Sequence, residues 1–294
     1  MSGAISLLGA TEIRELANEL GIVPSKGLGQ NFVHDSNICE KIVRLAGIDQ
    51  SDLVIEIGPG LGSLSLSIAR TGAKLLAVEI DKRLAARLPR TLQDHGVDAG
   101  SFTVITKDAM ELTRDELLIQ VDKAQRVKLV ANLPYNVSVP VVLHILEMNF
   151  ISSAMVMVQS EVAARLAAKP GSKEYGVPSA KVAWFADAEL SDSVGRAVFW
   201  PVPRVDSSLL HLKTHPPLAD ERLRKLTFTI IDAAFNQRRK MLRGALTRLM
   251  ADEVPGVDPV EILRDARIDP TSRAESISVT GFLAIAQEIL RRVN

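Results

Sequence analysis

The sequence is poor in cysteine, in net charge and in long apolar runs. Its single cysteine, Cys39, can neither close an intrachain disulfide nor complete a thiolate metal site, which is typical of proteins in a reducing compartment. Lysine plus arginine and aspartate plus glutamate each total 35, so any basic surface must be local. No run approaches the roughly 20 apolar residues that span a bilayer. We therefore expect a cytoplasmic protein with no membrane contact.

The rest of the composition is that of a folded protein. Its 294 residues, 47% of them hydrophobic and 24% charged, allow one large domain and one small one. From residue 53 onward, short apolar runs alternate with helical stretches; the runs are LVIEIG, KLLAVEID, FTVITKDAM and VKLVANLPY. Runs of this length between helices are typical of a parallel sheet covered on both faces. The pattern predicts an α/β fold with a Rossmann-like core.

Later segments extend this core and then change character. Strands are predicted over Ser153–Val158, Ala180–Ala186 and Ser207–Leu212, with a helix over Glu161–Ala168 between the first two. A pair of prolines at 216 and 217 ends the pattern. Beyond it, helices are predicted over Glu221–Asn236, Arg239–Met250, Pro259–Ala266 and Val279–Val293. We therefore expect a Rossmann-like domain over residues 1–215 and a small all-α domain over residues 216–294.

A glycine-rich turn follows the first apolar run. The stretch EIGPGLG places Gly58, Gly60 and Gly62 where the backbone can pass close to a ligand without a Cβ in the way. Such a turn also occurs without any ligand. A dinucleotide fingerprint would have its third glycine at the position of Ser63, and no Gly-Lys-Ser or Gly-Lys-Thr closes a P-loop. The spacing therefore favours a ligand without a pyrophosphate.

Two acids stand at the ends of the next apolar runs. Glu79 follows the first glycine by about twenty residues, where an acid accepts hydrogen bonds from ribose hydroxyls in nucleotide-binding sheets. Asp108 can accept a hydrogen bond from an adenine amino group, and Ile80 can lie against the ring. Either acid alone is more often a solvated strand end. Because the carboxyl ends of parallel strands share one crevice, we infer a phosphate-free adenosine ligand, which S-adenosylmethionine fits.

The fourth apolar run ends in Asn132, Leu133, Pro134 and Tyr135, which we predict to be the catalytic residues. The lone pair of an adenine N6 is delocalised into the ring, so a catalyst must hold the amine with acceptors and aim it at the methyl group. The side-chain oxygen of Asn132 and a backbone carbonyl at or before Pro134 supply acceptors, and Tyr135 can stack on a base taken out of its RNA stack. No general base is needed, because the nitrogen proton becomes acidic after methylation. The four residues alone favour a strand and a proline turn, but their position favours catalysis.

Together these motifs resemble the ribosomal RNA adenine dimethyltransferases of the KsgA/RsmA type, along nearly the whole chain. The matching stretches are GQNF (29–32), EIGPGLGSL (56–64), VEID (78–81), DAM (108–110), NLPYN (132–136), FWPVPRVDSS (199–208) and FNQRRKMLR (235–243). The resemblance implies S-adenosylmethionine-dependent dimethylation of two adjacent adenines near the 3′ end of 16S rRNA. It also implies an immature small ribosomal subunit as partner and a role in subunit biogenesis.

The resemblance assigns further residues to the site. It implies that Asn31 and the backbone of Val33 close the cofactor site together with Gly58, Glu79, Asp108 and Asn132. We count Gln30 and Ala109 from the same motifs with them. Family members commonly carry leucine in place of Val33, which is a mild change if only the backbone contacts the ligand. Phe199 is implied to stack on the target base, although a core aromatic at a strand end is an equally good interpretation. No metal is implied.

A cluster of cations is predicted to contact RNA. Arg238, Arg239, Lys240 and Arg243 have no acid between them, and the last three share one side of the predicted helix Arg239–Met250. Without the resemblance, a solvated helix face is the better interpretation. With it, we expect phosphate contacts. Because the substrate is large, we expect a monomer.

Three alternatives remain open. The erythromycin-resistance methyltransferases share the fold and the amino-methylating corner but modify 23S rRNA, and FNQRRKMLR with the long helical tail favours the small-subunit class. A ribosome-assembly or nucleic-acid-binding factor with vestigial catalysis is a second alternative, which the intact NLPY, Glu79 and Asp108 disfavour. A dehydrogenase is the third, and Ser63 argues against it.

Overall fold

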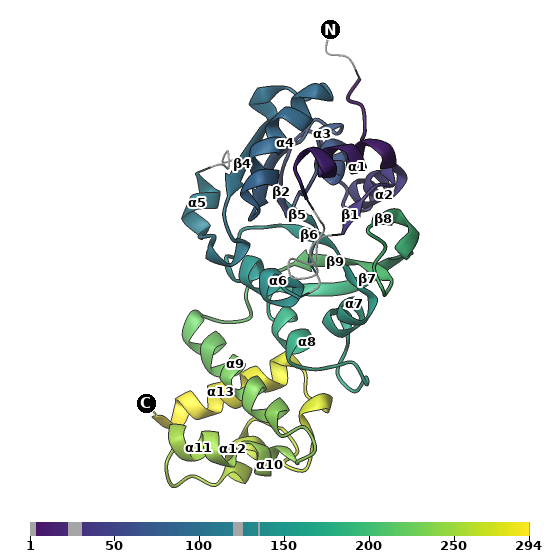
Figure 1. The fold of residues 1–294 in the computed structure, drawn as a ribbon. Coiled ribbons are helices and arrows are strands. Elements are labelled where there is room, and N and C mark those ends of the chain that lie inside the picture. Colours follow the sequence, from purple (N-terminus) through teal and green to yellow (C-terminus); the bar gives the residue numbers. More distant parts are fainter. Residues whose placement is uncertain (1–3, 23–30, 120–125, 135, 294) are drawn as a thin grey trace. The chain divides into compact units, whose positions relative to one another are not determined.

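The computed structural model describes residues 4–22, 31–119, 126–134 and 136–293 (Figure 1). Contacts divide the chain into two compact units, Met1–Ala163 with Glu189–Thr214, and Ala164–Ala188 with His215–Asn294. The last break adjoins the boundary drawn from the sequence, but the grouping of Ala164–Ala188 with the C-terminal residues was not expected. The assignment of catalysis to one domain and RNA binding to the other stays a prediction.

A seven-stranded sheet lies in the first unit, with the order β4-β3-β2-β5-β6-β9-β7 (Figure 1). Strands β2 to β6 pair in parallel, and β9 runs antiparallel to β6. The strands are β2 (Asp52–Ile57), β3 (Lys74–Glu79), β4 (Phe102–Thr106), β5 (Arg126–Asn132), β6 (Ser153–Gln159), β7 (Ala186–Val194) and β9 (Ser207–Thr214). A small antiparallel sheet joins β1 (Phe32–Val33) to β8 (Phe199–Trp200). The predicted Rossmann-like core is confirmed.

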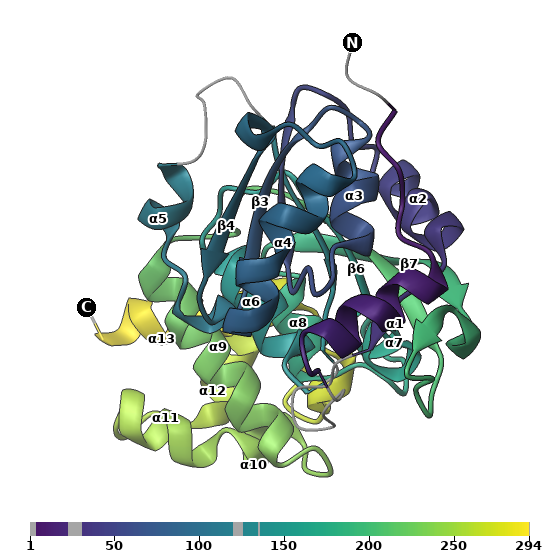
Figure 2. The same cartoon turned by 45° about the horizontal axis from the view of Figure 1, so that its top comes forward.

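Helices of the first unit each bury apolar side chains. They are α1 (Ala10–Glu19), α2 (Ser36–Leu45), α3 (Ser63–Ala69), α4 (Lys82–Asp94), α5 (Arg114–Leu118) and α6 (Ser138–Glu147), and α7 (Ser160–Ala167) leads into the second unit. Helices α3 and α4 pack against β3, and Figure 2 shows α4 in front of β3 and β4. Ile13, Ile42, Leu66 and Leu88, one from each of α1 to α4, belong to one core with alternate residues of the strands.

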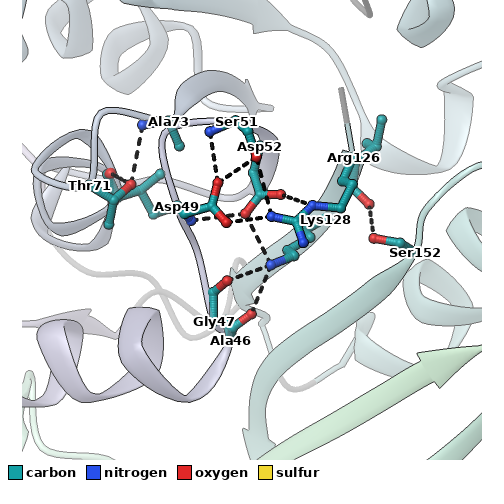
Figure 3. A network of polar contacts seen from close by, with 12 residues as sticks. Ala46, Gly47, Asp49, Ser51, Asp52, Thr71, Ala73, Arg126, Lys128 and Ser152 are labelled. Atoms are coloured by element: carbon teal, nitrogen blue, oxygen red, sulfur yellow. Dashed lines mark hydrogen bonds and ion pairs between the residues drawn. The ribbon is translucent and has the colours of Figure 1, made fainter. Parts of the chain in front are cut away.

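An ion-pair network lies at the amino ends of β2 and β5 (Figure 3). Asp52 is completely buried and contacts Lys128 Nζ and Arg126 Nε, each at 3.0 Å. Lys128 Nζ also donates to the carbonyl oxygen of Gly47, just beyond α2, at 2.6 Å. Arg126 further pairs with the exposed Asp49. The network ties two neighbouring strands to the end of a helix, at the strand ends opposite to those that carry the predicted site.

The second unit is helical and has an aromatic core. Its helices are α8 (Val177–Val182), α9 (Glu221–Asn236), α10 (Leu242–Ala245), α11 (Thr247–Glu253), α12 (Pro259–Asp265) and α13 (Val279–Val293). The ring of Trp184 lies edge-on to Phe228 at 5.9 Å between centroids, and Tyr175 lies edge-on to Phe235 at the same distance. The Tyr175 hydroxyl donates to the carbonyl oxygen of Ile277 at 2.8 Å. In the described part of the chain, no helix has the length and apolar character needed to cross a bilayer.

Two of the predicted elements are wrong. The segment Ala180–Ala186 is not a strand: it contains the end of α8 and a turn, and β7 begins only at Ala186. The predicted helix Arg239–Met250 is broken into α10 and α11, and Arg239 and Lys240 precede them in a turn. The start of α10 is set by long-range partners, because Leu242 N donates to the Ser272 carbonyl and Arg243 N to that of Pro270. The other predicted helices and strands are confirmed, with shifts of their ends.

Candidate functional site

The carboxyl ends of β2, β3 and β5 and the turn after β4 line one cavity in the first unit. Most of the residues predicted from the sequence lie on its wall, namely Asn31, Val33, Gly58, Gly60, Glu79, Ile80, Asp108, Ala109, Asn132, Leu133 and Pro134. Their convergence follows from the parallel order of the strands, which puts every carboxyl end at one edge of the sheet.

The glycine turn after β2 adopts a backbone that side chains with a Cβ rarely take. Gly58 and Gly60 have φ angles of 70° and 59°, in the left-handed region that glycine enters freely. A Cβ at Gly60 would lie 3.1 Å from two ring carbons of Phe32. Gly62 does not line the cavity, and a Cβ there would lie 3.0 Å from Leu88 Cδ1. The first two glycines therefore shape the cavity, whereas Gly62 lets the chain just before α3 pass close to Leu88 of α4.

Glu79 ends β3 with its carboxylate held by the backbone. Its Oε2 accepts a hydrogen bond from Gly60 N at 3.0 Å, and its Oε1 accepts one from Asp81 N at 2.9 Å. Burial raises the pKa of Glu79 above its usual value, while these two backbone donors oppose the rise. Each carboxylate oxygen can accept a second hydrogen bond. The side chain is thus oriented to receive two donors from the cavity, such as the hydroxyls of a ribose.

The part of the cavity wall formed by Ile80, Lys107 and Asp108 suits a flat ring without phosphates. Asp108 Oδ1 accepts a hydrogen bond from Met110 N at 2.9 Å, which fixes the carboxylate beside the cavity. Ile80 is 53% exposed although it is apolar, so a face is available for a ring. Lys107 is the one cation among the described lining residues, and its Nζ lies 2.6 Å from Glu116 Oε1. This contact lowers the pKa of Glu116 to about 2 and leaves the cavity without an uncompensated cation for a phosphate.

The predicted catalytic residues begin at Asn132, the last residue of β5. The side-chain Nδ2 of Asn132 donates to the backbone carbonyl of Asn31 at 3.1 Å. Leu133 N donates to Met157 O at 3.1 Å, and the Pro134 carbonyl already accepts from Val137 N at 3.2 Å. Of the two carbonyls considered for the substrate amine, that of Leu133 is therefore the better placed to accept. Tyr135 and Gln30 lie outside the described residues.

Phe199 does not line the cavity. It is only 1% exposed and belongs to the hydrophobic core, with Val33 as its partner in the small sheet. This position agrees with the interpretation of Phe199 as a core aromatic. Stacking of Phe199 on a base stays a prediction.

Glu56 and Phe32 are among the lining residues that sequence reasoning missed. Glu56 is 1% exposed in the middle of an apolar strand, and Ser65 Oγ donates to its Oε2 at 2.5 Å. Burial raises the pKa of Glu56 to about 8. It also raises the pKa of the neighbouring Cys39 thiol far above its usual value. The sequence could have indicated Glu56, since an acid in the middle of an apolar run is unusual. Phe32 gave no signal beyond its place beside Asn31.

The cations predicted to bind RNA lie in the second unit, but they do not share a helix face. Arg238 is held by Glu275, at 3.1 Å, and by the carbonyl of Lys173, at 3.0 Å. Arg239 and Lys240 follow in the exposed turn before α10, and Arg243 is exposed on α10 itself. The helical face predicted from their spacing is therefore wrong, although all four side chains are exposed.

The chain is similar in sequence to known proteins. The sequence model of a family described as Ribosomal RNA adenine dimethylase matches residues 25–289. The chain is 45% identical to a protein named Ribosomal RNA small subunit methyltransferase A from Corynebacterium jeikeium (strain K411), over 98% of each chain. It is 47% identical to one of the same name from Rhodococcus opacus (strain B4), covering 97% of this chain and 95% of that one.

Solved structures share the fold. A dimethyladenosine transferase from Plasmodium falciparum superposes with a TM-score of 0.75 at 21% identity, covering 89% of this chain and 98% of that one. The 23S rRNA methyltransferase ErmE gives a TM-score of 0.63 at 22% identity, covering 88% and 99%. At these identities, the likeness concerns the fold alone.

Proposed function

We propose that this chain, because it belongs to the ribosomal RNA adenine dimethylase family, transfers methyl groups from S-adenosylmethionine to the N6 atoms of two adjacent adenines near the 3′ end of 16S rRNA. The observation that carries the proposal is the single cavity whose wall carries Glu79, Asp108 and the oriented amide of Asn132. An immature small ribosomal subunit is the proposed partner. The proposed form is a cytoplasmic monomer.

The residues of the cavity fit S-adenosylmethionine. Glu79 would hold the ribose hydroxyls, Asp108 the adenine amino group and Ile80 the adenine face, with the glycine turn and Val33 around them. The compensated charge of Lys107 suits a ligand that has no phosphate. When bound, this cofactor supplies a methyl group on a positively charged sulfur.

The chain itself positions the substrate amine. Asn132 Oδ1 and the Leu133 carbonyl accept hydrogen bonds from the two N6 protons, which favours a tetrahedral nitrogen with its lone pair toward the methyl group. Tyr135, with Phe199 if that side chain becomes exposed, would stack on the flipped base. Arg239, Lys240 and Arg243, with Arg238 beside them, would contact RNA phosphates.

A methyl-transfer assay tests the proposal. Labelled S-adenosylmethionine is incubated with immature small subunits, large subunits and protein-free 23S rRNA, and the RNA is examined by mass spectrometry. We expect dimethyladenosine in 16S rRNA only, and its near-complete loss in Asn132→Ala with the cofactor still bound. Transfer to 23S rRNA alone would support the erythromycin-resistance type. Cofactor binding without transfer to any particle would support a binding factor.

A further inference from the structure

We propose that the backbone carbonyl of Asn31 orients the side-chain amide of Asn132, and that Phe32 is the positioning residue that holds this carbonyl in place. The inference rests on the proposed function, because it is the transfer step that gives the orientation of Asn132 its importance. The two residues come from distant parts of the chain, one before β1 and one at the end of β5. Their contact, Asn132 Nδ2 to Asn31 O at 3.1 Å, joins them directly.

The chemistry of this contact decides which way the amide faces. A backbone carbonyl can only accept, so the NH₂ group of Asn132 must point toward Asn31. The opposite arrangement would place two acceptor oxygens against each other. Oδ1 is thereby left on the other side of the amide as the acceptor for the substrate. An asparagine free to rotate would present a donor to the N6 protons in half of its orientations, and a donor cannot bind them.

Phe32 is held from two sides, which fixes the peptide that carries the Asn31 carbonyl. Its ring stacks on Trp200 with centroids 6.3 Å apart and planes 22° apart, and the two residues are partners in the β1–β8 pair. Gly60 also lies against the ring, since a Cβ there would come within 3.1 Å of it. The bond from His34 N to Val198 O, at 2.9 Å, continues the pairing. Phe32 is only 7% exposed, so this packing leaves it little freedom.

The same packing connects the amide with the cofactor side of the cavity. Gly60, which Phe32 covers, donates its N–H to Glu79 Oε2. A change in the glycine turn would therefore move Phe32, and with it the Asn31 carbonyl. Phe32 thus acts on transfer through Asn132, without itself touching the reacting atoms.

The first experiment observes the amide directly and needs no activity. The Asn132 side-chain NH₂ signals are identified in ¹H–¹⁵N spectra by their absence in Asn132→Asp. We expect them to be protected from solvent exchange in the wild type, to lose this protection in Phe32→Ala, and to keep it in Phe102→Ala. Phe102, a partly buried residue of the same core at the start of β4, serves as the matched truncation. Unprotected signals in the wild type, or unchanged protection in Phe32→Ala, overturn the proposal.

The second experiment measures kcat at saturating cofactor. We expect Phe32→Ala to lower kcat by about ten- to a hundredfold, as for a catalytic group displaced by about 1 Å, and Phe102→Ala to lower it far less. Asn132→Asp puts an ionised oxygen against the Asn31 carbonyl, so its kcat is expected to be low at neutral pH. As the pH falls, the protonated aspartate can donate to that carbonyl, and kcat should recover relative to wild type.

The outcomes separate this inference from the proposed function. Wild-type kcat in Asn132→Asp at neutral pH, or the same loss in Phe32→Ala and Phe102→Ala, overturns the positioning by Asn31 and Phe32. If the wild type itself transfers no methyl group to small subunits, the proposed function fails. The exchange protection of the amide still decides the inference in that case.

Discussion

Glu79 is the residue on which cofactor affinity should depend most. Glu79→Gln replaces one carboxylate oxygen by an NH₂ group, which would face the N–H of either Gly60 or Asp81 and could no longer accept a ribose hydroxyl. A hydrogen bond to a charged group contributes about 1.5–3 kcal/mol, so we expect S-adenosylmethionine to bind roughly ten- to a hundredfold more weakly. Titration calorimetry measures this, with Glu40→Gln, a surface partner of Arg70, as control. Equal Kd values in Glu79→Gln and wild type would contradict the role of Glu79.

Glu56 should make stability depend on pH in the direction opposite to most acids. Its pKa is raised from 4.5 to about 8 by burial, so the folded state holds a proton that the unfolded state loses. The contribution of Glu56 is therefore fully present below about pH 4.5 and is lost as the pH rises through 8. Glu56→Gln can still accept from Ser65, and we expect it to be more stable than wild type above pH 8, by an amount on the order of a few kcal/mol. Melting temperatures that change with pH in the same way in wild type and in Glu56→Gln would refute this prediction.

Site residues could be predicted from the sequence where a side chain of suitable chemistry stands at the end of a predicted strand. Glu79, Asp108 and Asn132 end strands or adjoin them, so their meeting follows from parallel order alone. Phe32 could not be identified in this way, because its importance comes from contacts with Gly60 and Trp200, which are distant in sequence. The burial of Phe199 likewise depends on the pairing of β1 with β8.

Among the elements, the junction of β2, β5 and α2 depends on the buried Asp52 (Figure 3). Asp52→Asn removes the charge that Lys128 and Arg126 share, and Lys128 is itself only 8% exposed. Breaking a buried pair in this way costs about 3–5 kcal/mol, and we expect a loss of that order in urea unfolding of the first unit. Asp49→Asn, at an exposed position of the same network, is the control and should cost far less. Equal effects of the two substitutions would show that burial is unimportant here.

The elements that the sequence misassigned share one physical cause. Ala180–Ala186 is a short apolar run, and such a run fits a buried helix as well as a strand. The segment is buried against α9, where Trp184 contacts Phe228, and this packing favours a helix and a turn over a strand. The helix around Arg243 begins late because its first N–H groups bond to the carbonyls of Ser272 and Pro270. Neither partner is visible from local periodicity, whereas the long amphipathic helices were predictable.

The exposed cations of the turn before α10 and of α10 itself, Arg239, Lys240 and Arg243, should determine the salt dependence of RNA binding. Arg239 and Arg243 are exposed, whereas Arg238 is tied to Glu275. The affinity falls with salt, and each lost phosphate contact makes the slope of log affinity against log salt less steep by about one. The slope of the double variant Arg239→Ala/Arg243→Ala should therefore be less steep by up to about two. Arg70→Ala, a surface cation of the first unit paired with Glu40, is the control. An unchanged affinity and slope in the double variant would exclude Arg239 and Arg243 from the RNA-binding surface.

For the whole molecule, the second unit takes residues from two separate parts of the chain. The segment Ala164–Ala188 supplies Trp184 and Tyr175 to its aromatic core, and Lys181 Nζ lies 2.8 Å from Asp232 Oδ2. A fragment of residues 216–294 therefore lacks both aromatic side chains. Removing a buried tryptophan alone costs about 3–5 kcal/mol, and the loss of both side chains exceeds the free energy of unfolding that so small a unit can lose. We expect no cooperative thermal unfolding from this fragment by circular dichroism.

A matched chain provides the control for this expectation. Residues 164–188 joined by a flexible linker to residues 215–294 restore the aromatic core, and this chain should unfold cooperatively. Trp184→Ala in the linked chain should abolish that transition again. A cooperative transition from residues 216–294 alone would show that the domain boundary drawn from the sequence is sufficient for folding.

The single thiol, Cys39, allows the opening of the first unit to be measured by its rate of chemical modification. Cys39, on α2, is completely buried in the core of the first unit, and its raised pKa keeps it in the unreactive protonated form. An alkylating reagent can thus modify the wild-type protein only during openings of the first unit, and mass spectrometry can count those events against time. Fluorophores or spin labels attached to a cysteine introduced in the second unit would carry no background from Cys39. The opening of each unit can therefore be timed separately within one intact chain.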